Sequence, residues 1–301
     1  TMYVVTGASG HTGSVVTKTL LKNGAKVRVI GRTPEHLKGL AAEGAEPFAA
    51  DLTDLGGVTK AVAGAKGVYV MMPPNVASPD FRAFQNRVAD TIAAAVKAAS
   101  VTHVVTLSSI GADKTEKTGP VIGLHYLEQQ LNRIDGLNVL HLRAGYFMEN
   151  TLAQIGIIQK MGMTVGPLSQ DLKLPMIATQ DIGEAAANAL LTLNFNQKQT
   201  RELLGQRDIS MSEVAQLIGK AISKADLRYV QAPDEQVRPA LIQIGMSPNM
   251  ADLILEMSAA LNSRYMRALE PRSGQNTTPT SYETFVTEEF VPLYEGKSAA
   301  A

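Results

Sequence analysis

The chain has 301 residues, of which 45% are hydrophobic, and its 28 basic and 28 acidic side chains give a formal net charge of zero. A neutral chain without basic runs has no field that would draw it onto nucleic acid or an anionic membrane, so neither is an expected partner. The sequence holds no cysteine, which excludes disulfides and thiolate chemistry and agrees with a cytoplasmic location.

The first half of the sequence alternates short β-branched runs with amphipathic stretches. The runs predict strands at Tyr3–Thr6, Val27–Ile30, Glu46–Ala50, Gly67–Met71, His103–Leu107 and Asn138–Leu142. Helices are predicted between them at Thr12–Asn23, Pro34–Glu43, Leu55–Ala63, Phe81–Ala99 and Leu124–Arg133. Strands that alternate with helices indicate βαβ units, and strands that are apolar throughout are covered on both faces. We therefore expect an α/β fold with a doubly wound, Rossmann-like parallel sheet.

After Asn150 the pattern becomes that of a smaller, mostly helical C-terminal lobe. Helices are predicted at Thr151–Met161, Ile182–Leu193 and Ser210–Lys224, the last with Ser210 or Ser212 as N-cap. Strands are predicted at Lys173–Ala178 and Thr200–Leu204, methionine-rich helices between Pro233 and Leu269, and a loop at Pro271–Thr280. No run of about 18 apolar residues predicts a transmembrane helix, and no signal peptide precedes the first strand.

The first predicted strand leads directly into a glycine-rich turn and then into a helix. Gly7 permits a tight turn, Gly10 lets backbone N–H groups approach a pyrophosphate, and Gly13 lets the helix pack closely on the strand. The N-terminus of the helix adds free N–H donors and a partial positive charge. This context predicts a dinucleotide site, and the alternative is a glycine-rich turn without a ligand. Further contacts are expected from Ser9, His11 and Thr12.

The end of the second predicted strand indicates which dinucleotide binds. Proteins that prefer NAD carry an acidic residue about 20 residues after the glycines, where it binds the ribose 2′-hydroxyl. This chain has Gly31 and then Arg32 at that place. A guanidinium suits a 2′-phosphate because it offers both charge and paired donors. Arg32 therefore predicts NADP as cofactor, with NADPH preferred over NADH, and a solvated surface arginine is the alternative.

Several further motifs occur in order along the chain. They are TGASGHTG at 6–13, GRTPEHL at 31–37, DLTD at 51–54, LSSIGA at 107–112, LRAGYFMEN at 142–150, DIGEAA at 181–186 and FVTEEF at 285–290. This set resembles the NmrA-like family of atypical short-chain dehydrogenases/reductases, which includes NAD(P)H:quinone and dye reductases. The resemblance covers nearly the whole chain and is specific for the family rather than for one reaction.

The resemblance also implies where individual residues lie around the cofactor. It places Asp51 and Leu52 by the adenine, Met72 and Pro73 along the cofactor, Leu107 and Ser108 near the nicotinamide ribose, and Gly145, Tyr146 and Phe147 beside the nicotinamide, with Asn150 close by. An N-cap of the following helix is the alternative for Asp51, and core packing is the alternative for Tyr146 and Phe147.

The proton-transfer pair of ordinary short-chain dehydrogenases is missing. That pair is Tyr-x-x-x-Lys, in which the lysine lowers the pKa of the tyrosine. Here Tyr126 is followed four residues later by Gln130, which supplies no charge, so standard alcohol dehydrogenation is not expected. His125 is the next candidate because histidine titrates near neutrality, although a structural histidine on a helix face is the alternative. His125 and Tyr126 are thus the two candidate catalytic residues.

Two functions fit these features. The first is an NADPH-dependent reductase that transfers hydride to an electron-poor apolar acceptor, such as a quinone, an azo or triphenylmethane dye, or an imine. The second is a non-catalytic NADP(H)-sensing regulator that binds a protein partner. We favour the enzyme because the second lobe is substantial and the methionine-rich segment 243–266 suits a small apolar or aromatic ligand. Asn150 and Tyr265 are the candidate substrate-binding residues.

These functions imply a division of the chain. Residues 1–150 should form an NADP-binding Rossmann domain with later contributions from about 174–206, and 151–301 should form mainly a discontinuous substrate-binding lobe. The five histidines lack metal-ligand spacing, so no metal site is expected. A homodimer is the default expectation for the oligomeric state.

Overall fold

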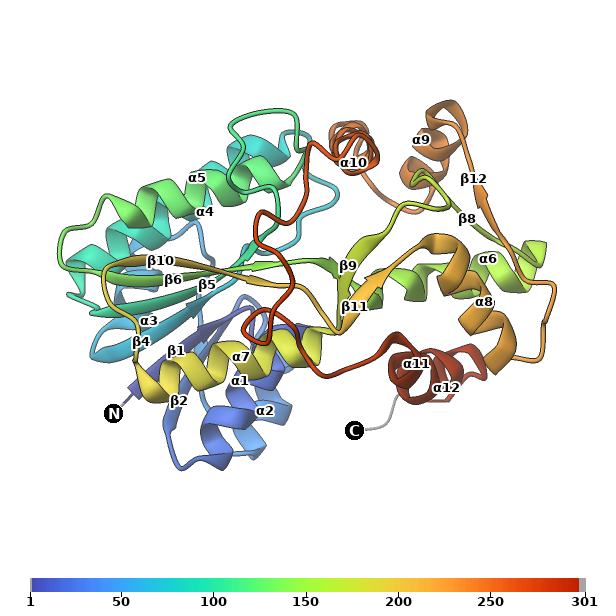
Figure 1. The fold of residues 1–301 in the computed structure, drawn as a ribbon. Helices are drawn as coiled ribbons and strands as arrows, with labels where there is room; N and C mark the ends of the chain where they lie inside the picture. Colours follow the sequence, from blue (N-terminus) through green and yellow to red (C-terminus); the bar gives the residue numbers. More distant parts are fainter. Residues whose placement is uncertain (1, 298–301) are drawn as a thin grey trace.

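Seven parallel strands form the central sheet of the structure, a computed structural model that describes residues 2–297 (Figure 1). Their order across the sheet is β10-β6-β5-β4-β1-β2-β3, so the chain starts in the middle and winds outward in both directions. This confirms the predicted doubly wound parallel sheet. The strands are β1 (Met2–Thr6), β2 (Lys26–Gly31), β3 (Glu46–Ala49), β4 (Ala65–Val70), β5 (His103–Ser109), β6 (Asn138–Ala144) and β10 (Lys198–Leu203).

Helices cover both faces of this sheet, which explains why its strands are apolar throughout. One face carries α3 (Leu55–Val62), α4 (Phe81–Ala98) and α5 (Val121–Asn132). The other carries α1 (His11–Lys22), α2 (Lys38–Ala42) and α7 (Thr179–Thr192). Successive strand residues point to opposite faces: Val4 lies in the first core, and Tyr3 and Val5 lie in the second. Helix α7 and strand β10 therefore complete the sheet layer, although they follow residue 150.

The second lobe lies beyond the carboxyl ends of the strands (Figure 1). It contains two small sheets, β11-β9-β7 and β12-β8, and helices on either side of them. Its strands are β7 (Tyr146–Phe147), β8 (Thr164–Gly166), β9 (Leu174–Ile177), β11 (Arg207–Ile209) and β12 (Tyr229–Gln231). Its helices are α6 (Gln154–Met161), α8 (Met211–Ala221), α9 (Asp234–Gln243), α10 (Pro248–Asn262), and α11 (Tyr282–Phe285), which runs through a π-helical segment into α12 (Val291–Tyr294).

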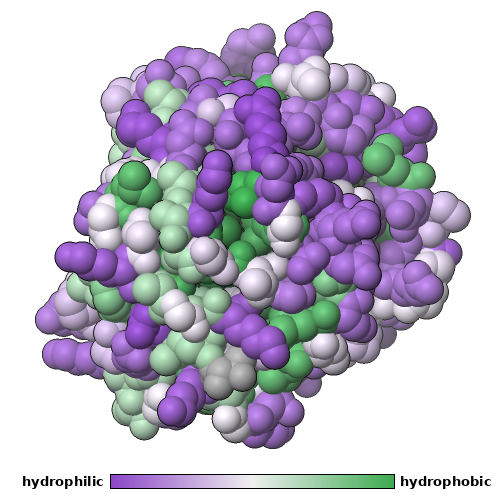
Figure 2. Space-filling model, turned by 90° about the vertical axis from the view of Figure 1, so that its left-hand side faces the viewer, coloured by the Kyte–Doolittle hydropathy of each residue, from purple (hydrophilic) through white to green (hydrophobic). Residues whose placement is uncertain are grey.

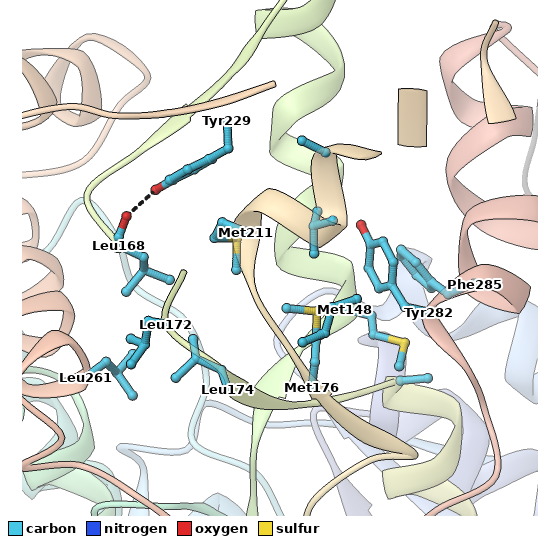
Figure 3. Packing of buried hydrophobic residues seen from close by; sticks show 14 of the residues in the cluster. Met148, Leu168, Leu172, Leu174, Met176, Met211, Tyr229, Leu261, Tyr282 and Phe285 are labelled. Atoms are coloured by element: carbon cyan, nitrogen blue, oxygen red, sulfur yellow. Dashed lines mark hydrogen bonds between the residues drawn. The ribbon is translucent and has the colours of Figure 1, made fainter. Parts of the chain in front are cut away.

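A separate apolar core holds the second lobe together. Tyr282 and Phe285 from the C-terminal helix stand beside Met148, while leucines and Met211 fill the space toward β9 (Figure 3). The Tyr229 hydroxyl donates a hydrogen bond to the carbonyl oxygen of Leu168 at 2.8 Å, so this buried polar group is satisfied. Many of the methionines and leucines that follow residue 150 are therefore part of this core.

Two helices begin earlier than the sequence indicated. Helix α7 begins at Thr179 rather than Ile182, because the Glu149 carboxylate accepts hydrogen bonds from the Thr179 backbone N–H and hydroxyl, at 2.9 and 2.6 Å. This distant carboxylate replaces a local N-cap. Helix α5 begins at Val121, directly after Pro120. In α8 the expectation holds, since Ser210 forms a capping box with Glu213.

Helix α10 fastens the second lobe to the sheet domain. The Ser247 N–H donates to the Val76 carbonyl at 2.9 Å, and the Phe81 N–H donates to Asn249 Oδ1 at 2.9 Å. Farther along α10, Glu256 Oε2 accepts from the Gly119 N–H at 2.7 Å. These bonds hold α10 across the loops that follow β4 and β5.

The surface of the described residues is mixed in character. Hydrophilic side chains cover most of the face opposite the second lobe, with smaller hydrophobic patches between them (Figure 2). Within residues 2–297, no helix is both long and apolar enough to cross a membrane.

Candidate active site

A cavity of about 710 Å³ opens at the carboxyl edge of the central sheet. Its wall is built from the loops after β1, β2, β3, β4 and β5, from the segment after β6, and from the first turn of α10. In open parallel sheets, ligands bind at this edge, where the strand order reverses. The volume lies within the range of about 300–1,000 Å³ that is usual for small-molecule sites.

The glycine-rich turn at one end of the cavity leaves no room for a side chain at Gly7 or at Gly13. Gly7 has φ +60°, and a Cβ there would lie 2.4 Å from Met71 Cε. A Cβ on Gly13 would lie 2.2 Å from the carbonyl oxygen of Gly7, which requires a glycine where α1 crosses the turn. Helix α1 has no side-chain N-cap and no acidic residue in its first turn. The free N–H groups at its N-terminus therefore suit an anionic group such as a pyrophosphate.

The three polar residues of this turn differ in what they offer. Ser9 and His11 are exposed at the cavity. Thr12 also lines it, but its hydroxyl is buried, accepts a 2.8 Å hydrogen bond from the Tyr69 hydroxyl and donates to Met71 Sδ. Thr12 can therefore contribute its backbone N–H to a phosphate rather than its hydroxyl.

Arg32 and Asp51 line the same end of the cavity, after β2 and β3. Arg32 is exposed and forms no ion pair with any described residue. Asp51 Oδ1 accepts hydrogen bonds from the Thr53 hydroxyl and N–H at 2.6 and 2.8 Å. These bonds lower the pKa of Asp51, and the positive charge of Arg32 adds a smaller effect in the same direction. Asp54, not Asp51, is the N-cap of α3. The guanidinium is thus free for an anion, and Asp51 is held as a carboxylate beside it.

Every hydroxyl at the far end of the cavity donates its hydrogen to a protein oxygen. Ser108 donates to Glu128 Oε1 at 2.6 Å, Ser109 to the Ile110 carbonyl at 2.8 Å, and Thr179 to Glu149 Oε1 at 2.6 Å. Glu149 also lines the cavity; its Oε1 accepts two hydrogen bonds, and its Oε2 is buried without a hydrogen-bond partner. Among the described residues that line this end, no hydroxyl has a hydrogen directed into the cavity.

The two candidate proton donors do not reach the cavity. His125 Nδ1 lies 2.7 Å from the Ala112 carbonyl, and the Tyr126 hydroxyl donates to Asp90 Oδ1 at 2.8 Å on the outer side of α4 and α5. The hydrogen bond to Asp90 raises the pKa of Tyr126, which is the opposite of the shift that a tyrosine acid–base catalyst needs. Helix α5 turns both side chains away, so the geometry gives their predicted catalytic roles no support.

Most of the other sequence candidates line the cavity. These are Gly7, Ser9, Gly10, His11, Thr12, Arg32, Asp51, Leu52, Met72, Pro73, Leu107, Ser108, Phe147 and Asn150.

Four further candidates lie outside the lining, three of them because they pack against other parts of the protein. Gly13 packs against Gly7, as described above, and a Cβ on Gly145 would lie 2.5 Å from the Pro175 carbonyl oxygen. Tyr146 packs against the core of the second lobe, and burial raises its pKa. Tyr265 is 38% exposed, with the Lys114 ammonium 5.3 Å from the centre of its ring.

The cavity also has an apolar arm that the sequence did not reveal. It is lined by Pro74, Val76, Phe81, Phe84, Val121, Leu124 and Met250, with Gln85 among them. The position of 74–85 after β4 was a usable signal, because that segment starts at the carboxyl edge of the sheet. Met250 belongs to the methionine-rich segment expected to cover the pocket, but the sequence did not distinguish it from its neighbours.

The chain belongs to the NmrA-like family, whose model matches residues 2–291. It is 28% identical over 267 residues to an NAD(P)H azoreductase from Xenophilus azovorans, a match that covers 88% of this chain and 89% of the relative.

Solved structures are similar across the whole fold. An NADPH-dependent quinone oxidoreductase from Escherichia coli, complexed with NADPH, has a TM-score of 0.76 at 22% identity and covers 100% of this chain and 96% of its own. A triphenylmethane reductase from Citrobacter sp., complexed with NADP(H), has a TM-score of 0.79 at 18% identity, with coverage of 95% and 99%.

Proposed function

We propose that this protein is an NADPH-dependent reductase that acts on a flat, apolar, electron-poor acceptor. NADPH supplies a hydride from its nicotinamide ring when bound. Candidate acceptors are a quinone, an azo or triphenylmethane dye, or an imine. The names of the azoreductase, quinone oxidoreductase and triphenylmethane reductase to which the chain is similar support this class of acceptor.

The residues of the cavity fit a phosphorylated dinucleotide. The glycines Gly7 and Gly10 of the turn and the uncapped N-terminus of α1 suit a pyrophosphate. Arg32, which pairs with no described carboxylate, would hold the 2′-phosphate. Asp51 and Leu52 would border the adenine, and Met72 and Pro73 would lie along the cofactor.

The observation that carries the choice of acceptor is that no hydroxyl group at the far end of the described cavity is free to donate a proton. Ser108, Ser109 and Thr179 direct their hydrogens into the protein. Reduction of an ordinary ketone needs an acid beside the oxygen as hydride arrives. A cationic dye does not, because it becomes neutral on receiving hydride. A quinone gives a stabilised anion that water protonates, an imine becomes a neutral amine when it reacts as its cationic iminium form, and an azo group that has received hydride takes its proton from water. The apolar arm around Phe81 and Met250 would hold such an acceptor.

The test is turnover of NADPH by a catalytic amount of protein. Menadione, methyl red, malachite green and a cyclic imine are added in turn, and the loss of reduced nicotinamide is followed by absorbance. We expect sustained oxidation, above the rate without protein, with at least one of these acceptors and not with a simple aliphatic ketone. Tight NADPH binding without turnover across the panel would contradict the reductase and support the NADP(H)-sensing regulator instead.

A further inference from the structure

A buried ion pair lies directly behind one of the serines of the cavity wall. Ser108, at the end of β5, is 3% exposed, and Glu128, on α5, is 2% exposed. Glu128 Oε1 accepts from the Ser108 hydroxyl at 2.6 Å and from Arg143 Nε at 3.0 Å, and Glu128 Oε2 accepts from Arg143 Nη2 at 2.6 Å. Three elements, β5, α5 and β6, thus bring a hydroxyl, a carboxylate and a guanidinium together.

The pair determines which atom holds the hydrogen between Ser108 and Glu128. A carboxylate that is paired with a guanidinium has acceptor oxygens only, and a guanidinium has donors only. The hydrogen therefore belongs to Ser108 and points at Glu128. A buried ion pair by itself adds little to stability, because desolvation offsets the attraction, so stability alone does not account for this arrangement.

We propose that Glu128 and Arg143 are positioning residues that make Ser108 a fixed hydrogen-bond acceptor toward the cavity. Because its hydrogen is bonded to Glu128, the Ser108 oxygen can offer the cavity lone pairs alone. Its ligand partner must then be a donor, which in a dinucleotide means a ribose hydroxyl or the carboxamide N–H of the nicotinamide half. This inference rests on the proposed function, since it assigns the role of Ser108 in binding NADPH.

The variant Glu128→Gln removes the charge that fixes this direction, with little change in shape. Arg143 faces both oxygens of Glu128, so either orientation of the glutamine amide sets its NH2 group against an Arg143 donor. In the orientation that keeps the carbonyl against Arg143 Nη2, the NH2 group faces Ser108 and donates to it, and the Ser108 hydrogen turns toward the cavity and meets the donor of the ligand. We expect Glu128→Gln to weaken NADPH binding about five- to tenfold, as Ser108→Ala does, which is the usual effect of losing one hydrogen bond.

The deciding experiment is a double-mutant cycle in NADPH dissociation constants, measured by calorimetry. If Glu128 acts through Ser108, then adding Glu128→Gln to Ser108→Ala weakens binding by less than about twofold. If the fold losses in NADPH affinity of the two single variants multiply in the double variant, the positioning role is overturned. Ser258→Ala is the matched control, since Ser258 is buried, donates to the Ile254 carbonyl and does not line the cavity. Its NADPH affinity should equal that of the wild type.

Thermal unfolding checks that each variant is folded. If Glu128→Gln does not fold, the cycle is run with Glu128→Asp, which keeps the charge beside Arg143 but withdraws the acceptor from Ser108. We expect that Glu128→Asp, added to Ser108→Ala, also weakens NADPH binding by less than about twofold. If the fold losses in affinity of the two single variants multiply, the positioning role is again overturned. Absence of NADPH binding by the wild type would overturn the proposed function, whereas binding by the wild type with multiplied losses would overturn the positioning role alone.

Discussion

Single side chains determine which dinucleotide the cavity should prefer. Arg32 lies after β2, at the place where NAD-preferring relatives of this fold carry an acid, and Asp51 nearby is already bonded to Thr53. An unpaired guanidinium at the edge of a cavity gains most from a ligand that brings its own phosphate. We therefore expect the preference for NADPH over NADH to depend on this one residue.

The variant Arg32→Ala tests this preference. We expect the affinity for NADPH to fall by about 1.5–3 kcal/mol, tenfold or more, because one charge-assisted phosphate contact is lost. The affinity for NADH should change little. Arg87→Ala is the control, because Arg87 is exposed on α4 and does not line the cavity. An equal loss of affinity for NADPH and NADH would show that Arg32 does not bind the 2′-phosphate.

The variant Tyr126→Phe tests whether catalysis needs the tyrosine that stands where ordinary short-chain dehydrogenases carry their acid. Its hydroxyl bonds to Asp90 away from the cavity, so we expect most of the reductase activity to remain. The loss of one exposed hydrogen bond should cost at most about 1 kcal/mol of unfolding free energy. A collapse of the turnover rate in a protein that still unfolds at the wild-type temperature would show that Tyr126 takes part in the reaction.

Among the elements, α10 contributes one side chain to the wall of the apolar arm. Its first turn is capped by Ser247, whose hydroxyl accepts from the Met250 N–H at 3.0 Å, and the bonds to Val76 and Phe81 hold it over the loop after β4. Met250, 7% exposed, is the side chain that α10 contributes to the cavity wall. A flexible thioether in this position can adapt to acceptors of different outline.

Shortening that side chain should affect the acceptor and not the cofactor. We expect Met250→Ala to raise the KM of the acceptor several-fold while the dissociation constant for NADPH stays unchanged, because Met250 is part of the apolar arm. Met161→Ala is the matched control, since Met161 is 58% exposed on α6 and is absent from the lining. A selective loss of NADPH affinity in Met250→Ala would show that the arm belongs to the cofactor site.

The elements also differ in how well the sequence predicts them. The strands and helices around the central sheet follow from local periodicity, and so does the turn from Gly7 to Gly13. Strands β8 and β11 have three residues each and exist because they pair with β12 and β9, so local sequence gives no signal for them. The start of α7 depends on Glu149, about 30 residues earlier along the chain.

The parts of the candidate site also differ in how well the sequence predicts them. The glycine turn from Gly7 to Gly13 could be predicted because one short segment of the chain builds it. The apolar arm and the Ser108–Glu128–Arg143 contacts could not, because each needs residues from several elements to meet. The directions of the His125 and Tyr126 side chains also depend on how α5 sits against α4, which periodicity does not specify.

At the scale of the whole molecule, the buried histidine of the central sheet makes stability depend on pH. His141 Nδ1 lies 2.8 Å from the Thr106 hydroxyl, and its Nε2 lies 2.9 Å from Asn132 Oδ1. Burial lowers the pKa of His141 from 6.5 to about 4. The folded state therefore holds this ring neutral, whereas the unfolded chain binds a proton below pH 6.5.

The stability contributed by this neutral ring is present above pH 6.5 and is lost as the pH falls toward 4. Urea unfolding should reveal a loss of up to about 3 kcal/mol from this one group. Carboxylates add their own dependence at lower pH, so the informative quantity is the difference between the wild type and His141→Gln. We expect the variant to be less sensitive to pH in this window. Identical pH slopes in the two proteins would mean that His141 titrates normally in the folded state.

The central claim is that the cavity at the carboxyl edge of the sheet is a site for a phosphorylated dinucleotide. Calorimetric titration of the wild-type protein with NADPH and with NADH, at low ionic strength, tests it most directly. Saturable binding of one dinucleotide per chain, tighter for NADPH than for NADH, is the expected result. No saturable binding of either dinucleotide would contradict the roles given to the glycine turn, to Arg32 and to the proposed hydride transfer together.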